Sequence, residues 1–323
     1  MHASDPAAVI SASEAPRKRT SVRPSVANSL LGSIGRTPLL SLAGIASDSA
    51  SPFGLWAKAE FLNPTGSVKD RAAISMVRQA LDDGRLTPKH TLIDASSGNT
   101  AVAYAMLGAQ LGFSVEVCLP RNVHPERLQR IQAYGARIVF TDPLDGTDGA
   151  QREARKRSIE NPDQYFFPDQ YNNPANPQAH YATTGPEIWE QSQRRITHFV
   201  AGVGTGGTIS GVARFLKEQR GSVRVIGVQP AGPIHGIEGL KHIPSALRPS
   251  TYDESLIDET IRVETDVARA MSRQLAQDEG LLVGNSSGAA VWAAREIGRA
   301  SPGAVVVTIL PDRGDRDGSV VGA

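Results

Sequence analysis

Apolar and polar positions along this chain follow the pattern of buried strands that alternate with amphipathic helices. Runs rich in apolar and β-branched residues predict strands. These runs cover residues 55–61, 91–94, 114–119, 136–140, 197–201, 223–228 and 304–309. Helical spacing between them predicts helices over 100–111, 125–134 and 209–217. This alternation predicts an α/β fold with mostly parallel sheets and helices on both faces.

The chain also shows signs of a two-domain organisation. Its 323 residues favour two domains. A stretch rich in Pro and Asn, residues 167–177, predicts a crossing between them. We expect a larger domain formed by 28–62 and 175–323 and a smaller, mobile domain over 63–174. Residues 1–27 lack periodicity and predict a flexible extension.

Composition and charge exclude several classes of function. The net charge of +1 gives no global attraction to nucleic acid, and no apolar run is long enough to span a bilayer. Cys118 is the single cysteine, which excludes an internal disulfide and a cysteine zinc site. The seven histidines show no metal-binding spacing, so we expect no metal. No apolar segment of a secretory signal follows the start, and we expect a cytoplasmic protein.

One stretch places a lysine where a nucleophile is expected. Residues 63–71 follow a predicted strand, and their Pro and Gly predict a turn before a helix. Lys69 therefore lies at a loop-to-helix junction. The positive end of the helix and Arg71 disfavour a second positive charge, so Lys69 is expected to lose its proton easily. A neutral amine can form a Schiff base with an aldehyde. The alternative is a solvated lysine that begins a helix.

A second stretch, residues 202–208, joins a predicted strand to a helix and predicts a phosphate site. Glycines allow close approach of the backbone to an oxyanion, and a helix N-terminus supplies N–H donors. The sequence lacks the Gly-Lys-Ser/Thr ending of a nucleoside-triphosphate loop. A dinucleotide site and a plain tight turn are the alternatives. The dinucleotide alternative needs an acidic residue after strand 223–228, where Gln229 and Pro230 stand.

Two further polar stretches stand at the predicted starts of helices. Residues 94–100 carry hydroxyl and amide groups that suit a carboxylate, although Ser and Asn are also ordinary helix caps. Residues 283–290 repeat this pattern, and capping is again the alternative. Ligands of open α/β sheets bind beyond the carboxyl ends of the strands. All four stretches are therefore expected on one side.

Together the four stretches resemble the cysteine synthase and cystathionine β-synthase family. The motifs are Asn-Pro-Thr-Gly-Ser-Val-Lys-Asp-Arg, Ser-Gly-Asn-Thr, Gly-Thr-Gly-Gly-Thr and Ser-Ser-Gly-Ala, and the resemblance covers about residues 28–316. Segments 236–242 and 312–316 are most similar to B-type cysteine synthases. The family consists of pyridoxal-phosphate enzymes of the tryptophan-synthase-β fold, also called fold type II.

The resemblance implies a cofactor, pyridoxal 5'-phosphate, and a role for each matching residue. Lys69 would hold the cofactor as a Schiff base and then move the α-proton of the substrate. Asn99 would bond the ring hydroxyl, and Ser286 would face the pyridine nitrogen. The cofactor phosphate would lie on Gly204, Thr205, Gly206, Gly207 and Thr208. The substrate would lie on Ser96, Ser97, Thr100 and Gln170, with Gly236 and Lys241 at the mouth of the site.

The implied reaction is a β-replacement on O-acetyl- or O-phospho-L-serine, in which sulfide or another sulfur donor gives L-cysteine. A serine beside the pyridine nitrogen makes the ring a weaker electron sink than an aspartate would, which favours quick loss of the β-substituent. Lys241 could attract a phosphate, or it is a surface lysine. The family analogy also implies a homodimer.

Two other functions stay open at this point. Ala101, Asn285 and the altered end after Arg316 depart from the family pattern. They keep open a specialised synthase that uses a nitrogen, thiol or carrier-protein nucleophile. A non-catalytic relative that serves as a binding subunit is the other alternative, against which the retained Lys69 argues.

Overall fold

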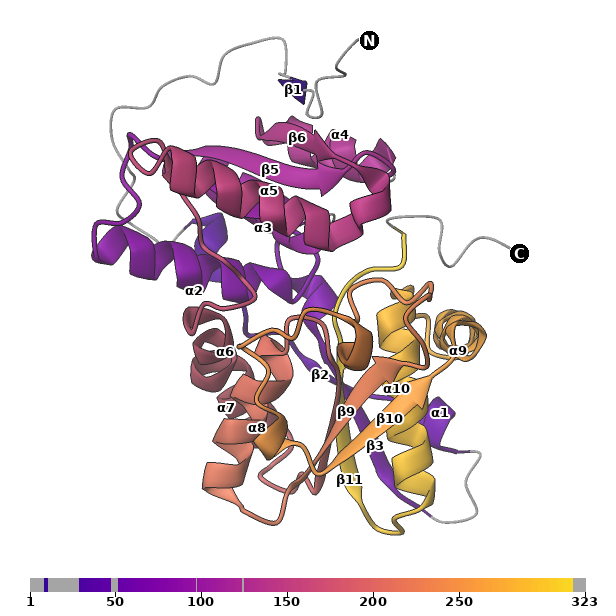
Figure 1. The fold of residues 1–323 in the computed structure, drawn as a ribbon. Coiled ribbons are helices and arrows are strands. Elements are labelled where there is room, and N and C mark those ends of the chain that lie inside the picture. The colour runs from indigo at the N-terminus through magenta and orange to yellow at the C-terminus, as the bar shows by residue number, and fades with distance from the viewer. Residues whose placement is uncertain (1–8, 11–28, 48–51, 97, 124, 316–323) are drawn as a thin grey trace. The chain divides into compact units, whose positions relative to one another are not determined.

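The computed structural model describes residues 9–10, 29–47, 52–96, 98–123 and 125–315 (Figure 1). Contacts within the chain divide it into two compact units. Unit 1 is Met1–Ile34 with Ala73–Asn173, and unit 2 is Gly35–Ala72 with Pro174–Ala323. The divisions fall after Ile34, after Ala72 and after Asn173, and the second of them lies inside helix α2, Lys69–Asp82. Lys69 therefore belongs to unit 2. The expected mobility of the smaller domain stays a prediction.

Unit 1 is built around a five-stranded sheet of order β1-β6-β5-β4-β7. Its strands are β1 Val9–Ile10, β4 Thr91–Ala95, β5 Ser114–Pro120, β6 Arg137–Thr141 and β7 Tyr165–Phe166. Only β1 runs antiparallel to its neighbour among these described strands. β1 lies within the predicted extension 1–27, whose other residues lie outside the described part of the chain.

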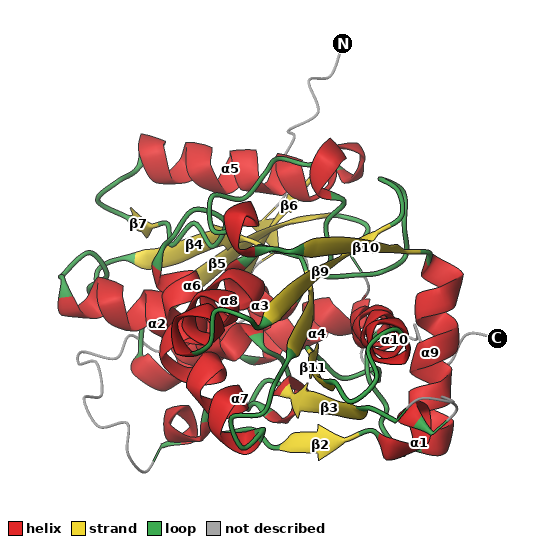
Figure 2. Ribbon diagram, turned by 90° about the horizontal axis from the view of Figure 1, so that it is seen from below, coloured by secondary structure: helices red, strands yellow, loops and turns green. Residues whose placement is uncertain are grey.

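Helices cover both faces of this sheet (Figure 2). The unit contains η1 Leu30–Ser33, most of α2, α3 Asn99–Leu111, α4 Pro125–Ala133, η3 Pro143–Asp145 and α5 Gly146–Glu160. One face packs on α5 through a cluster that includes Ile93, Cys118 and Ala154. α3 ends at Gly112, whose φ of 88° is a left-handed conformation that glycine adopts without strain.

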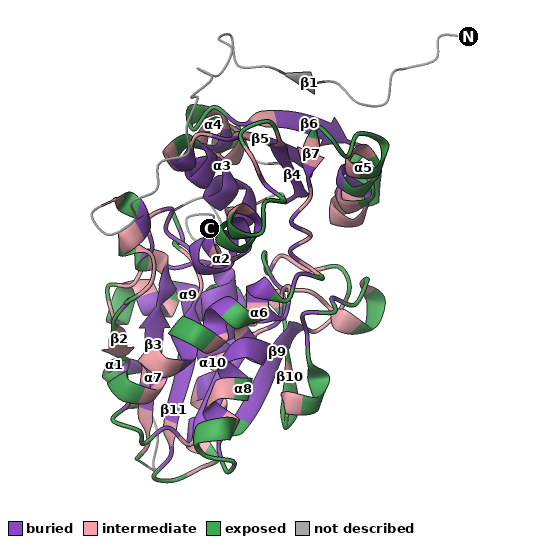
Figure 3. Ribbon diagram, turned by 90° about the vertical axis from the view of Figure 1, so that its left-hand side faces the viewer, coloured by how far each residue is buried: buried purple, intermediate pink, exposed green. Residues whose placement is uncertain are grey.

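Unit 2 is built around a six-stranded sheet of order β10-β9-β8-β11-β3-β2. Its strands are β2 Leu39–Ser41, β3 Gly54–Ala59, β8 His198–Gly202, β9 Arg224–Pro230, β10 Glu259–Val263 and β11 Val305–Leu310. Only β2 is antiparallel to its neighbour in the described sheet. The inner strands β4, β5, β8, β9 and β11 are largely buried (Figure 3).

Two apolar layers enclose the sheet of unit 2, because successive strand residues point to opposite faces. Val200, Ile226 and Val306 pack toward α9 and α10, whereas Phe199 and Val225 pack toward α7 and α8. The helices are α1 Ala43–Ala46, α6 Ala175–Ala179, α7 Gly185–Gln191, α8 Gly207–Gln219, α9 Thr265–Asp278 and α10 Asn285–Arg299. Short turns are η2 Glu60–Leu62, the π-helical η4 His180–Thr184, η5 Ile243–Ser245 and η6 Glu254–Leu256.

The structure confirms the predicted α/β class with mostly parallel sheets and helices on both faces. Every predicted strand corresponds to an observed one within two residues at each end. The sequence patterns did not predict α5, α9 and β10, in which charged residues stand between the apolar ones. No helix among the described residues combines the length and the apolar character that crossing a membrane requires.

Candidate active site

The turn before Lys69 is fixed by its own side chains. The amide and hydroxyl of Thr65 both donate to the buried carboxylate of Asp70. Gly66 has a φ of 79°, a left-handed conformation that this tight turn requires. The amide of Lys69 donates to Ser67 Oγ at 3.3 Å at the first turn of α2. The motif residues therefore set the position from which the Lys69 side chain leaves the backbone.

Asp312 connects this turn to the start of α10. Ser67 and Asp312 form an antiparallel bridge, and the Val68 amide donates to the Pro311 carbonyl at 2.8 Å. The Gly284 amide, just before α10, donates to the Asp312 carbonyl at 3.2 Å. A Cβ at Gly284 would lie 2.5 Å from Asp312 Oδ1, so a larger residue there would displace the Asp312 side chain. The segment after β11 thus holds two of the predicted site stretches side by side.

The amine of Lys69 has the character expected of a nucleophile. Burial lowers the pKa of Lys69, and the nearby charge of Asp312 opposes this effect. The direction agrees with the sequence prediction, but the cause is desolvation and not the charge of Arg71. From the sequence, Asp312 was noted only as part of segment 312–316, which is similar to B-type cysteine synthases. Its two backbone links became visible only in the fold.

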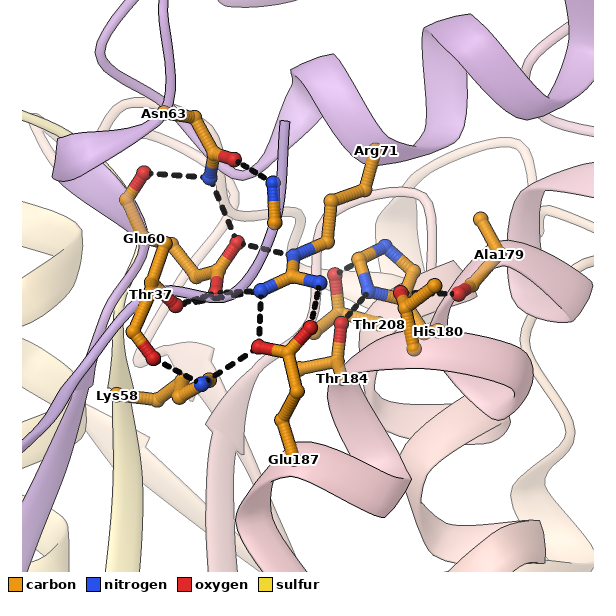
Figure 4. Close-up of polar contacts among 12 residues, drawn as sticks. Thr37, Lys58, Glu60, Asn63, Arg71, Ala179, His180, Thr184, Glu187 and Thr208 are labelled. Carbon is orange, nitrogen blue, oxygen red and sulfur yellow. Dashed lines mark hydrogen bonds and ion pairs between the residues drawn. The ribbon is translucent and has the colours of Figure 1, made fainter. Parts of the chain in front are cut away.

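Arg71 belongs to a buried ionic cluster below the turn (Figure 4). Its Nε and Nη2 donate to Glu60 at 2.7 and 2.8 Å, and its Nη1 and Nη2 donate to Glu187, each at 2.7 Å. Lys58 Nζ lies 2.7 Å from Glu187. Thr37 and Asn63 supply further hydrogen bonds to Glu60. These bonds anchor the first turn of α2, which begins with Lys69.

The predicted phosphate turn lies between β8 and α8 in unit 2. Gly206 has a φ of 85° and would meet the Tyr252 backbone if it carried a Cβ. A Cβ at Gly204 would collide with the Gly239 carbonyl, and one at Gly207 with the Asn176 side chain. The amide of Gly207, the first residue of α8, donates to Thr205 Oγ1 at 3.4 Å. The helix start and the required glycines suit a phosphate.

Three residues outside the glycine turn hold its threonines. Asn176 Nδ2 donates to Thr205 Oγ1 at 3.1 Å, and Thr251 Oγ1 donates to the Thr205 carbonyl at 2.6 Å. His180 Nε2 lies 3.2 Å from Thr208 Oγ1, as Figure 4 shows. Burial and the charge of Arg71 lower the pKa of His180 to about 3, so this imidazole is neutral. Sequence reasoning missed these three residues, because no local motif connects them to the turn.

Ser286 lies in the first turn of α10 and is buried. Its neighbour Asn285 is only 5% exposed, and Asn285 Oδ1 has no hydrogen-bond partner within the described residues. Gly288 packs against the Ala268 carbonyl, which brings α9 close to this turn. The helix start thus presents a buried serine and an unsatisfied amide oxygen.

The loop predicted to line the mouth lies beside the glycine turn. The amide of Lys241 donates to the Val203 carbonyl at 2.8 Å. Gly236 donates its amide to Thr265 Oγ1 at 3.0 Å and would meet Arg269 if it carried a Cβ. Lys241 is half-buried and Ile234 is 98% exposed. Unit 2 therefore groups this loop with the phosphate turn.

The predicted carboxylate residues gather in unit 1. Gln170 Nε2 donates to the Ala95 carbonyl at 2.9 Å, and Thr100 Oγ1 donates to Gln170 Oε1 at 2.8 Å. Ser96 Oγ accepts a bond from the Gly98 amide at 3.3 Å. Asn99 is the first residue of α3, and Ser97 lies outside the described residues. Gln170 thus connects the strand end to the helix start.

The described residues contain no group of three or more His, Cys, Asp or Glu side chains that could hold a metal ion. Burial raises the pKa of the Cys118 thiol. The groups described above are a desolvated amine, hydroxyls, amides and helix N-termini.

Comparison with known proteins identifies the family. A family described as pyridoxal-phosphate dependent enzyme matches residues 30–312. A cysteine synthase of Aquifex aeolicus is 49% identical over 292 residues, which are 89% of each chain. A cysteine synthase B of Salmonella typhimurium is 44% identical and covers 90% of this chain and 94% of its own. A crystal structure of cysteine synthase from Entamoeba histolytica superposes with a TM-score of 0.85 at 34% identity, over 94% of this chain and 91% of its own.

The chain belongs to the family of pyridoxal-phosphate-dependent enzymes. The predicted resemblance to cysteine synthases is confirmed by these relatives. Its cofactor is pyridoxal 5'-phosphate. The residues of unit 2 fit this group, because a desolvated lysine and a glycine turn at a helix start match its aldehyde and its phosphate.

Proposed function

We propose that the protein is a cysteine synthase that converts O-acetyl- or O-phospho-L-serine and a sulfur donor into L-cysteine. The observation that carries the proposal is the desolvated Lys69 on a turn that Asp312 joins to the start of α10. The cysteine synthases among its relatives support the substrate class.

Lys69 serves as the acid and base of the proposed reaction. Its amine has a lowered pKa, so a neutral form is available to take the α-proton of the serine derivative. Bound pyridoxal phosphate supplies an electron-withdrawing ring that stabilises charge at this carbon. The bond from Cβ to the ester oxygen breaks, and the bond from Cβ to sulfur forms. Lys69 then returns the proton to Cα.

The other matching residues hold the reactants. Gly204, Thr205, Gly206, Gly207 and Thr208 are proposed to hold the cofactor phosphate. Ser286 is proposed to bond the ring nitrogen, and Asn99 the ring hydroxyl. Ser96, Ser97, Thr100 and Gln170 are proposed to bind the substrate carboxylate. Their hydroxyl and amide groups, together with the start of α3, suit an anion.

The identity of the leaving group depends on Lys241 in this proposal. Its backbone adjoins the phosphate turn through Val203, and its ammonium can attract a phosphoryl leaving group. Lys241→Ala should raise the KM for O-phosphoserine about tenfold, which is the effect of one partly exposed ion pair, and leave that for O-acetylserine unchanged. Lys89→Ala, which removes an exposed lysine of unit 1, is the matched control. Equal effects on both donors would remove Lys241 from the proposal.

A specialised synthase with another nucleophile is the second candidate. The buried Asn285, whose Oδ1 has no partner within the described residues, favours it, because an unsatisfied amide can recognise a polar nucleophile. We also propose a homodimer, as the family resemblance implies. Light scattering during gel filtration tests this assembly.

The test of the proposed function is an amino-acid analysis of products. Purified protein loaded with cofactor is given O-acetylserine or O-phosphoserine together with sulfide, thiosulfate, a small thiol or an amine nucleophile. L-Cysteine formed by wild-type protein and not by Lys69→Ala supports the cysteine synthase. A product that contains another nucleophile supports the specialised synthase. Cofactor binding without any product would favour a non-catalytic binding subunit.

A further inference from the structure

The carboxyl group of Asp94 lies at the base of the proposed carboxylate turn of unit 1. Asp94 is in β4 and is 1% exposed. The Ala95 amide donates to Asp94 Oδ1 at 2.7 Å. Asp94 Oδ2 is buried and has no hydrogen-bond partner in the part of the chain that the structure describes. A buried carboxyl oxygen without a donor disfavours the charged form.

The groups around Asp94 come from three elements. Tyr104 of α3 and Cys118 of β5 lie near it, and the segment after β7 contributes Asp169 and Tyr171. Asp169 also pairs with Arg155 of α5 at 2.7 Å. Burial raises the pKa of Asp94 to about 7, against the effect of the backbone amides of Ala95 and Gln170, while the charge of Asp169 adds to the rise. Burial and the charge of Asp169 thus favour the neutral carboxyl group.

Asp94 is connected directly to the residues proposed to bind substrate. Ala95 donates its amide to Asp94, and its carbonyl accepts from Gln170 Nε2 at 2.9 Å. Gln170 Oε1 in turn accepts from Thr100 at 2.8 Å. A change in the charge or geometry of Asp94 therefore reaches both ends of the turn through two hydrogen-bonded residues.

We propose that Asp94 is a positioning residue for the amino-acid donor: its neutral form allows Ser96, Thr100 and Gln170 to bind the substrate carboxylate, and its ionised form weakens that binding. The inference rests on the proposed role of these three residues. Its physical reason is that a buried negative charge disfavours a second one nearby, and the interaction is strong where water is excluded. We expect a loss of donor affinity of about three- to tenfold when Asp94 ionises.

The first experiment follows the carboxyl group itself. Carbon-13 NMR of protein labelled at aspartate side chains gives a titration curve for each carboxyl, and Asp94→Asn identifies the resonance of Asp94 by its loss. A midpoint near 7 supports the proposal. A midpoint near the ordinary aspartate value of about 3.9 overturns it.

The second experiment separates KM from kcat. The KM for O-acetylserine is measured from pH 6 to pH 8 with cofactor-loaded wild type, Asp94→Asn and Asp163→Asn, which removes an exposed acid of unit 1. Between pH 6 and pH 8, the KM of the wild type and of Asp163→Asn should rise about three- to tenfold more than the KM of Asp94→Asn. The change of kcat with pH should differ less between these proteins. An equal rise in all three proteins overturns the proposal.

Two further variants distinguish failure of this inference from failure of the proposed site. If Ser96→Ala and Thr100→Val leave the KM for the donor unchanged, the proposed carboxylate site is contradicted. The proposed role of Asp94 is then overturned as well. If both raise the KM but Asp94→Asn keeps the pH dependence of the wild type, only the role of Asp94 is overturned.

Discussion

Arg71 donates hydrogen bonds to both carboxylate oxygens of Glu60, from Nε at 2.7 Å and from Nη2 at 2.8 Å. The two side chains are 2% and 0% exposed, so this pair is among the most buried in unit 2. Burial alone would raise the pKa of Glu60, but the charge and hydrogen bonds of Arg71 outweigh it and lower the pKa. Arg71 lies two residues after Lys69 in α2, and Glu60 directly follows β3. The pair therefore connects the start of α2 to the end of β3.

Removing Arg71 should therefore destabilise unit 2. Arg71→Met leaves Glu60 as a buried charge without its partner, which costs about 3–5 kcal/mol. Urea unfolding followed by tryptophan fluorescence measures this, because Trp56, Trp189 and Trp292 all lie in unit 2. Arg214→Met removes an exposed ion pair to Glu218 on α8 and should cost less than about 1 kcal/mol. Equal losses in both variants would contradict the importance of the buried pair.

Glu187 should make unit 2 sensitive to acid. Burial would raise the pKa of Glu187, but Arg71 and Lys58 lower it from 4.5 to about 2. A lowered carboxyl pKa adds stability that is present above pH 4.5 and is lost as the pH falls toward 2. Glu187→Gln should thus lose stability at pH 7, and its difference from wild type should shrink in acid. Urea unfolding at several pH values tests this, with the exposed Glu190 of the same helix, changed to Gln, as control.

Gly206 should be required for cofactor affinity. Its φ of 85° and the nearby Tyr252 backbone leave no room for a side chain. Gly206→Ala strains the phosphate turn, and a left-handed alanine alone costs about 1–2 kcal/mol. Titration of the apoprotein with pyridoxal phosphate should show at least a tenfold loss of affinity. Gly232→Ala faces open space within 4 Å and should bind as the wild type does. Normal affinity in Gly206→Ala would argue against this turn as the phosphate site.

His180 should act on the cofactor through Thr208 in its neutral form. Burial and the charge of Arg71 lower the pKa of His180 to about 3, so its bond to Thr208 should persist from pH 5 to pH 8. His180→Leu removes this bond and should lower cofactor affinity about fivefold, the value of one neutral hydrogen bond. His180→Gln can restore a group that hydrogen-bonds to Thr208 and should recover part of the loss. A wild-type affinity that follows a group titrating near pH 6.5 would contradict a neutral His180.

Cys118 should be inert in the folded protein. It lies in β5 with 0% exposure, and burial raises the pKa of its thiol. A thiol is a poor nucleophile when it is neutral and enclosed. Ellman's reagent should therefore react with the native protein only slowly and with the urea-unfolded protein at once. Rapid reaction of the native protein would place Cys118 in an accessible, reactive environment.

The class of fold and the residues of the four motifs could be predicted from the sequence alone. Apolar β-branched runs specify buried parallel strands, because such strands need apolar side chains on both faces. Gly66 stood out as part of a Pro and Gly turn, and Gly206 as part of a glycine stretch that allows close approach of the backbone to an anion. Lys69 was recognisable from its junction between turn and helix. These features depend on neighbours within a few residues.

The distant residues that support those motifs could be identified only from the three-dimensional fold. Asp312, His180 and Glu187 are far from Lys69, Thr208 and Arg71 in the sequence, and they meet through sheet pairing and helix packing. The cause of the lowered pKa of Lys69 was likewise a matter of burial, which local charge could not reveal. Desolvation and long-range hydrogen bonds arise when the chain closes on itself, and a linear pattern carries little trace of them.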